Sequence, residues 1–336
     1  MKVLIAGGAG FIGSYIAQKL VRRGDEVIIY DGFLSYVNPF DVNYEIPTDL
    51  LDRKWSIREL IEKRFVGITD KIKIIRGDIR HKGRLAKVIN EHRPSKIICL
   101  AALPLATASN IFTEDAMSIH TAGTANILEI LRDINFVDQF IYTSSSMIYG
   151  NFNSDKIAEN EQANPINIYG GTKLCGEILT KVYSEQFGIN YTIIRPSAVY
   201  GPTDVNRRVS QIFLENAYNG KPIPIHNGGV SRLDFTYVRD VADGFVLALD
   251  NSAAIGETFN ITRGEGRSLM EFFEILKRHF PDIKTIETKT EKTEKRPERG
   301  ALNIDKAKNI LGYHPRYSLE DGIEEYVEYV RKEGLV

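Results

Sequence analysis

The segment KVLIAGGAGFIG, residues 2–13, opens with five residues typical of a buried strand and closes in a glycine-rich loop. Gly8, Gly10 and Gly13 fit the pattern G-x-G-x-x-G, in which glycines let the backbone approach a pyrophosphate closely. An apolar stretch follows and predicts a helix whose first N–H groups point at the same place. Asp31 lies 18 residues after Gly13, at the end of the next expected strand. This order is typical of a dinucleotide-binding unit.

Asp31 also indicates which dinucleotide binds. Its carboxylate can accept hydrogen bonds from the ribose diol but would repel a 2′-phosphate, so the sequence favours NAD over NADP. A tight turn without a ligand is the alternative, and the strand and helix around the loop argue against it. The residues of the loop that we expect at the cofactor are Gly7, Gly10, Phe11 and Ile12.

The first part of the chain alternates short β-branched runs with amphipathic stretches, as parallel strands joined by helices do. The expected strands are 2–6, 26–30, 71–76, 96–100, 139–143 and 191–195. The expected helices are 12–23, 83–92, 116–135 and 169–188, with another over 207–219. We therefore predict an α/β fold, a doubly wound parallel sheet of the Rossmann type with a smaller α/β C-terminal substrate lobe.

The domain organisation follows from a change in the sequence after Pro196, where segments rich in proline and glycine, typical of loops, begin. We expect residues 1–196 to form the NAD-binding domain and 197–336 the substrate lobe. One more apolar strand and helix follow within 234–262, and we expect this segment to return to the first domain.

An insertion occupies the 46 residues between Asp31 and Asp78, because a strand–helix–strand step needs far fewer. Leu51 and Trp55 recur at near-helical spacing and predict a helix over 49–65. We interpret it as a surface helix that covers the sheet edge, rather than a flap over a substrate or partner.

Composition narrows the class of function. A formal net charge of -1 and the lack of a basic tail argue against nucleic acid and membrane surfaces as partners. No apolar run approaches the ~18 residues of a transmembrane helix, and the N-terminal residues enter the first strand without a signal peptide. Cys99 and Cys175 have no redox or ligand spacing. We expect a cytoplasmic protein without a metal.

A second cluster of residues carries chemistry. Tyr169 and Lys173 lie one turn apart on the same helix face, so the ammonium can lower the pKa of the phenol. Ser145, in a run of three serines that ends a strand, lies 24 residues before Tyr169 and offers a hydrogen bond to the same oxygen. With the glycine loop, these residues indicate hydride transfer at a carbinol carbon, with Tyr169 as general base. By itself, the pair could be an ordinary feature of an amphipathic helix.

Further motifs run nearly the length of the chain. They are GDIR at 77–80, LAA at 100–102, SSSMIYG at 144–150, RPSAVYGP at 195–202 and DFTYVRDV at 234–241. Together with the loop and the Tyr169–Lys173 pair, they resemble the extended short-chain dehydrogenase/reductase family, in its nucleotide-sugar epimerase/dehydratase group. The resemblance implies that NAD is the cofactor and that Ser145, Tyr169 and Lys173 are catalytic, with Tyr169 and Lys173 also contacting the cofactor.

The same resemblance implies further binding roles. Asp78 and Ile79 would border the adenine, and Leu100, Ala101 and Ala102 would line the cofactor groove. The implied substrate-binding residues are Ser145, Ser146, Ser197, Arg208, Arg232 and Arg299.

The arginines among these residues suit a diphosphate. Arg232 and Arg299 match positions where family members carry phosphate-binding arginines, and a guanidinium can bind two phosphate oxygens at once. Solvated surface charges are the alternative for both, and Arg208 is a weaker candidate.

Departures from the family pattern bear on the reaction. In the implied mechanism Tyr169 removes the proton of the sugar 4-hydroxyl while hydride leaves C4 for NAD. Dehydrating relatives have an Asp-Glu pair directly after the catalytic residue, where this chain has Ser146 and Met147. Decarboxylating relatives usually have Glu at the Met147 position. We therefore expect an epimerase that acts at C4 of a nucleotide-diphosphate sugar, a UDP-hexose in the leading interpretation.

Other interpretations stay open. A 4,6-dehydratase or a decarboxylase would begin with the same oxidation, and a non-catalytic NAD-binding protein would share the fold. His120 stands where many relatives have Asn, and Ser197 stands where galactose epimerases have Asn, so the identity of the sugar is open. The apolar faces of 116–135 and 169–188 correspond to a dimer contact in related proteins, which implies a homodimer.

Overall fold

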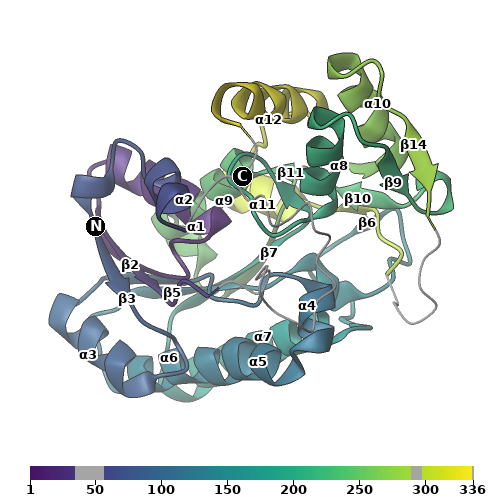
Figure 1. Cartoon of the computed structure of the whole chain (residues 1–336). Coiled ribbons are helices and arrows are strands. Elements are labelled where there is room, and N and C mark those ends of the chain that lie inside the picture. Colours follow the sequence, from purple (N-terminus) through teal and green to yellow (C-terminus); the bar gives the residue numbers. More distant parts are fainter. Residues whose placement is uncertain (35–56, 289–296, 335–336) are drawn as a thin grey trace.

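The computed structural model describes residues 1–34, 57–288 and 297–334. Its centre is a seven-stranded parallel sheet with the order β12-β7-β5-β4-β1-β2-β3 (Figure 1). The strands are β1 (Lys2–Ala6), β2 (Glu26–Asp31), β3 (Ile72–Arg76), β4 (Lys96–Cys99), β5 (Gln139–Thr143), β7 (Tyr191–Pro196) and β12 (Glu257–Ile261). The order runs outward from β1 in both directions, which confirms the predicted doubly wound sheet.

Helices cover both faces of this sheet (Figure 1). One layer contains α1 (Phe11–Arg22), α9 (Val238–Asp250) and α11 (Asp305–Leu311), and the other contains α3 (Lys82–His92), α6 (Thr124–Arg132) and α7 (Ile168–Phe187). Along β1, Val3 and Ile5 pack in the first layer and Leu4 in the second, and all three are fully buried. Burial on both faces explains why the strands read as continuous apolar runs.

The helix predicted over 116–135 is present but runs from residue 113 to residue 132. It consists of α5 (Thr113–Met117), a π-helical turn at Ser118–Gly123 and α6, which ends at Arg132. The turn directs His120 into the interior, where its Nε2 accepts a hydrogen bond from the Leu103 N–H at 2.9 Å. A π turn adds one residue to a helical turn without breaking the helix, so the sequence predicts the helix but not its π turn.

The insertion contributes α2 (Ile57–Arg64), the described part of the helix predicted over 49–65. Leu51 and Trp55 lie outside the described residues. The helix lies beside α1 over the β2 side of the sheet (Figure 1), and Gln18 Nε2 donates to the Arg64 carbonyl at 2.7 Å.

The second lobe has its own core, formed around Phe213, Phe272 and Tyr326. Its elements are β8 (Val199–Tyr200), α8 (Val209–Tyr218), β9 (Ile223–Ile225), β10 (Arg232–Asp234), β11 (Thr236–Tyr237), β13 (Gly266–Ser268), α10 (Leu269–His279), β14 (Thr285–Glu287) and α12 (Leu319–Glu333). Short elements elsewhere are α4 (Ala106–Ile111), β6 (Lys156–Ile157) and β15 (Ala301–Leu302). Helix α8 begins two residues later than predicted, because Arg207 has a φ of 52° and Arg208 is the extended N-cap.

Candidate active site

A cavity of about 1160 Å³ lies where the carboxyl ends of β1, β2, β4 and β5 face the second lobe. In open α/β sheets, ligands bind at this edge, where the strand order reverses. Every residue predicted to bind cofactor lines the cavity: Gly7, Gly10, Phe11, Ile12, Asp31, Asp78, Ile79, Leu100, Ala101, Ala102, Tyr169 and Lys173. So do the predicted substrate-binding residues Ser145, Ser146, Ser197, Arg208, Arg232 and Arg299. The fold thus brings all of them to one place, and their individual roles stay predictions.

The glycine loop has the backbone that a pyrophosphate requires. Gly7 has a φ of +77°, and a Cβ at this position would lie 2.5 Å from the Ala101 nitrogen, so no side chain fits. Helix α1 begins at Phe11, and no side chain caps its first N–H groups. These groups, together with the helix dipole, can hold an anion in the cavity. The loop therefore fits the diphosphate of NAD.

Asp31 lies at the end of β2 beside this loop. Its Oδ2 accepts a hydrogen bond from the Ala9 N–H at 2.9 Å and its Oδ1 accepts one from the Phe33 N–H at 2.8 Å. Burial raises the pKa of Asp31, and the two N–H groups oppose that shift. Each carboxylate oxygen keeps a further lone pair, so the predicted contact with the ribose diol remains possible.

Asp78 follows β3 on the other side of the same edge. Arg80 Nη2 donates to its Oδ2 at 2.7 Å, and the Arg80 backbone N–H donates to its Oδ1 at 2.8 Å. Burial would raise the pKa of Asp78, but the bonds from Arg80 lower it overall. Its side chain is thus held in place by Arg80 beside the buried Ile79.

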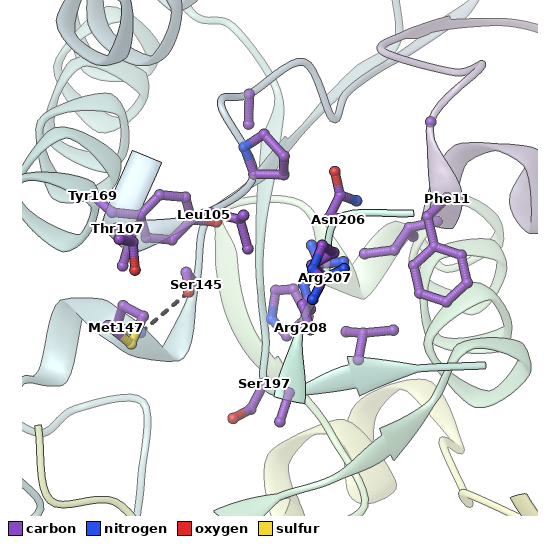
Figure 2. A pocket seen from close by; sticks show the side chains of 18 of the residues that line it. Phe11, Leu105, Thr107, Ser145, Met147, Tyr169, Ser197, Asn206, Arg207 and Arg208 are labelled. Carbon is purple, nitrogen blue, oxygen red and sulfur yellow. Dashed lines mark hydrogen bonds between the residues drawn. The ribbon is translucent and has the colours of Figure 1, made fainter. Parts of the chain in front are cut away.

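The predicted catalytic residues come from two elements. Ser145 follows β5 and caps a short 3₁₀ turn by accepting the Met147 N–H at 3.2 Å, as Figure 2 shows. Tyr169 and Lys173 lie in the first turns of α7. Lys173 Nζ donates to the Thr143 carbonyl at 2.8 Å and lies 6.0 Å from the centroid of the Tyr169 ring. Burial lowers the pKa of Lys173 to about 8.

The electrostatics of Tyr169 differ from the expectation. Burial raises the pKa of its phenol above 10, and the opposing influences are the charge of Arg208 and a hydrogen bond with Ser145. Lys173 was expected to lower this pKa, but its ammonium is directed at the Thr143 carbonyl. Arg208, from the second lobe, is therefore the cation that acts on Tyr169 here.

His120 packs behind Tyr169 without lining the cavity, a position that the sequence did not reveal. It is buried, and its ring lies edge-on to the Tyr169 ring with centroids 5.4 Å apart. Because Nε2 accepts the Leu103 N–H, the proton is on Nδ1, which lies 2.7 Å from Thr172 Oγ1. Burial and the Lys173 charge hold the pKa of His120 well below 6.5, so a neutral ring packs against Tyr169.

Of the predicted substrate residues, Ser145 and Ser146 follow β5, Ser197 follows β7, and Arg208 and Arg232 lie on the second lobe. Ser146 Oγ donates to Ser197 Oγ at 3.0 Å, and both side chains are buried. Arg208 Nη1 lies 2.7 Å from Asp204 Oδ1, while Arg232 Nε donates to the Gly266 carbonyl at 3.2 Å.

Figure 2 shows which further residues surround the reacting end. Leu105, Thr107 and Met147 lie around Ser145 and Tyr169, and Arg207 lies with Arg208 toward Phe11. After β4, the sequence analysis predicted site residues only as far as Ala102. Because ligands bind beyond the carboxyl ends of the strands, the residues that follow Ala102 could have been predicted as well.

Comparison with known proteins identifies the class. The chain matches the NAD dependent epimerase/dehydratase family over residues 3–262 and belongs to that family. The family assignment confirms the predicted resemblance and NAD as the cofactor. No helix of the described chain is long and apolar enough to span a membrane, and the described residues contain no His/Cys/Asp/Glu group that could hold a metal.

Particular relatives narrow the comparison. The chain is 31% identical over 333 residues to an uncharacterized UDP-glucose epimerase, YtcB, of Bacillus subtilis, with 98% of each chain covered. It is 28% identical to UDP-glucuronate 4-epimerase 1 of Arabidopsis thaliana, covering 98% of this chain and 76% of that protein. The structure of UDP-glucuronic acid 4-epimerase from Bacillus cereus with UDP-glucuronic acid and NAD superposes with a TM-score of 0.85, at 28% identity and 99% coverage of both chains.

Proposed function

We propose that this protein interconverts the C4 epimers of a nucleotide-diphosphate sugar, in the first instance a UDP-hexose. The observation that carries the proposal is the meeting of Ser145, Tyr169 and Lys173 in a cavity that also contains the glycine loop. The similarity to UDP-glucose and UDP-glucuronate 4-epimerases supports it.

The side chains suit such a reaction. The chemistry that NAD supplies when bound is the acceptance and the return of a hydride at C4 of the sugar. Tyr169, as the phenolate that the positive charge of bound NAD would favour, takes the proton of the 4-hydroxyl as the C4–H bond breaks, which leaves a 4-keto sugar. Ser145 donates a hydrogen bond to the same oxygen, and Tyr169 returns its proton once the sugar has presented its other face.

The surroundings of Ser145 favour epimerisation over elimination. Met147 follows two residues after Ser145 and contacts it through its backbone N–H. A thioether neither donates nor accepts a proton in catalysis, so a 4,6-dehydratase or a decarboxylase would need an acid or base from elsewhere in the chain. We keep such a lyase as the second candidate because it would start from the same oxidation.

Proton NMR of the protein in deuterated water tests both candidates. The substrates would be UDP-, GDP-, CDP- and dTDP-hexoses, their N-acetyl forms and their uronates. We expect a new C4 epimer of one sugar without deuterium in the ring. Deuterium at C5 or C6, a lasting 4-keto product or release of carbon dioxide would instead establish a lyase.

We further infer that residues 1–196, with the return segment 234–262, bind NAD and that 197–336 bind the sugar nucleotide. The position of β12 in the sheet and the separate core around Phe272 support this division. We also infer a cytoplasmic location, because Cys99 and Cys175 are both free thiols.

We infer a homodimer from the outer face of α7. Ile178 and Val182, one turn apart on this helix, are each about half exposed, at 53% and 48%. Large apolar side chains grouped on one helix favour pairing with the same face of a second copy.

A further inference from the structure

Arg64, the last residue of α2, is a buried cation outside the predicted site. Its side chain is 5% exposed and lines the same cavity as the glycine loop. Nη1 donates to the Ala9 carbonyl at 2.8 Å and Nη2 donates to the Thr203 carbonyl at 2.6 Å. Nε has no hydrogen-bond partner among the described residues. Burying a guanidinium costs free energy, so these bonds must offset a large penalty.

Its two acceptors belong to different parts of the site. Ala9 lies in the glycine loop, and its N–H donates to Asp31. Thr203 lies in the segment 201–208 that leads into α8, where it has a φ of 68°. This left-handed conformation is unfavourable for threonine, so surrounding bonds must hold it.

The segment 201–208 positions Arg208. Asp204, directly after Thr203, is buried and accepts bonds from Arg208 Nη1 at 2.7 Å and 2.9 Å. The charge of Arg208 in turn acts on Tyr169. Burial lowers the pKa of Arg64 to about 10, and the negative charges of Asp204 and Asp31 oppose that shift.

We propose that Arg64 is a positioning residue that joins the glycine loop to the segment 201–208, so that the cofactor loop and Arg208 are held in place together. One side chain of the insertion thereby links the two binding functions of the cavity. The proposal rests on the proposed function in one respect, because it takes UDP as the ligand of the second lobe.

Three variants of the full chain test the link: Arg64→Met, Arg208→Met and the double variant. NAD bound per chain would be measured after denaturing the purified protein, and the Kd of UDP would be measured by calorimetry with NAD in excess. We expect Arg64→Met to lower the NAD content and to weaken UDP binding by about tenfold, the equivalent of ~1.4 kcal/mol. Arg208→Met should weaken UDP binding and leave the NAD content unchanged.

The double variant separates positioning from a general loss of structure. If Arg64 acts through Arg208, the double variant binds UDP no more weakly than Arg208→Met alone. The proposal would be overturned if the losses of UDP affinity in the two single variants multiplied in the double variant. It would also be overturned if the Arg64→Met protein kept its NAD. Both readouts need no turnover, so a protein that binds NAD and UDP but epimerises no sugar would refute only the proposed function.

Matched variants complete the design. Arg58→Met, on the exposed face of the same helix, should change neither readout, because the Arg58 side chain is 88% exposed and its Nε lies 2.9 Å from Glu62 Oε1. Tyr15→Phe removes the bond from the Tyr15 hydroxyl to the Pro202 carbonyl at 3.1 Å and should weaken UDP binding alone. If Arg64→Met does not fold, Arg64→Lys replaces it, because lysine keeps the charge but cannot reach both carbonyls as the guanidinium does. NAD content and UDP affinity should then both fall, and unchanged values would contradict the proposal.

Discussion

At the scale of single residues, the hydroxyl of Tyr169 is the group on which the reaction depends. Tyr169→Phe removes it but keeps the ring that packs edge-on against His120. We expect kcat to fall by about 10²–10⁴-fold, the usual contribution of a general base, while bound NAD stays unchanged. Initial rates and NAD content of the purified variant measure both, and loss of NAD would assign Tyr169 to cofactor retention instead.

Lys173 makes stability depend on pH. Burial lowers its pKa from 10.5 to about 8, so the unfolded chain binds the extra proton between pH 8 and 10.5. The free energy of unfolding therefore contains a penalty that is full below pH 8 and disappears as the pH rises to 10.5. We expect wild type to gain up to ~1.4 kcal/mol per pH unit over Lys173→Met in this range. Urea titrations of both proteins at several pH values measure this difference. Parallel pH profiles of the free energy of unfolding would show that burial of the ammonium carries no such penalty.

At the scale of elements, α7 is attached to the sheet by a buried ion pair. Arg195 on β7 contacts Glu177 on α7 through two bonds, Nε–Oε1 at 2.9 Å and Nη2–Oε2 at 2.7 Å. Glu177→Ala would leave the buried guanidinium without its counter-ion, and we expect a loss of about 3–5 kcal/mol in urea unfolding. The exposed pair Arg58–Glu62 is the control, because solvent screens it and Glu62→Ala should change the free energy of unfolding far less. Equal losses would show that the buried pair is not what holds α7.

At the scale of the whole molecule, the exposed face of α7 determines the proposed assembly. Val182→Glu would place a charge in the middle of a face that the dimer buries, so we expect a monomer by light scattering after size exclusion. Ile286→Glu, on exposed β14 of the second lobe, should leave the mass unchanged. A wild-type protein that already elutes as a monomer would refute the dimer.

Much of this organisation can be read from the sequence because its signals are local. The glycine loop, the β-branched strands and the Tyr169–Lys173 spacing depend on residues a few positions apart, and strand–helix alternation leaves few possible topologies. The cavity confirms this by collecting Gly7, Asp31 and Tyr169 at one sheet edge.

Tertiary structure alone decided the features that depend on distant partners. His120 is neutral because it is buried near the Lys173 charge, and its ring is held by the Leu103 N–H and by Thr172. The charge of Arg208, from the second lobe, acts on the pKa of Tyr169 on α7. Burial, which no local pattern records, reversed the expected shift in the Tyr169 pKa. The sequence by itself determined the class of chemistry and the edge of the sheet at which the site residues meet. The contacts that set the charges and positions of these side chains form only when segments far apart in the chain pack against one another and exclude water.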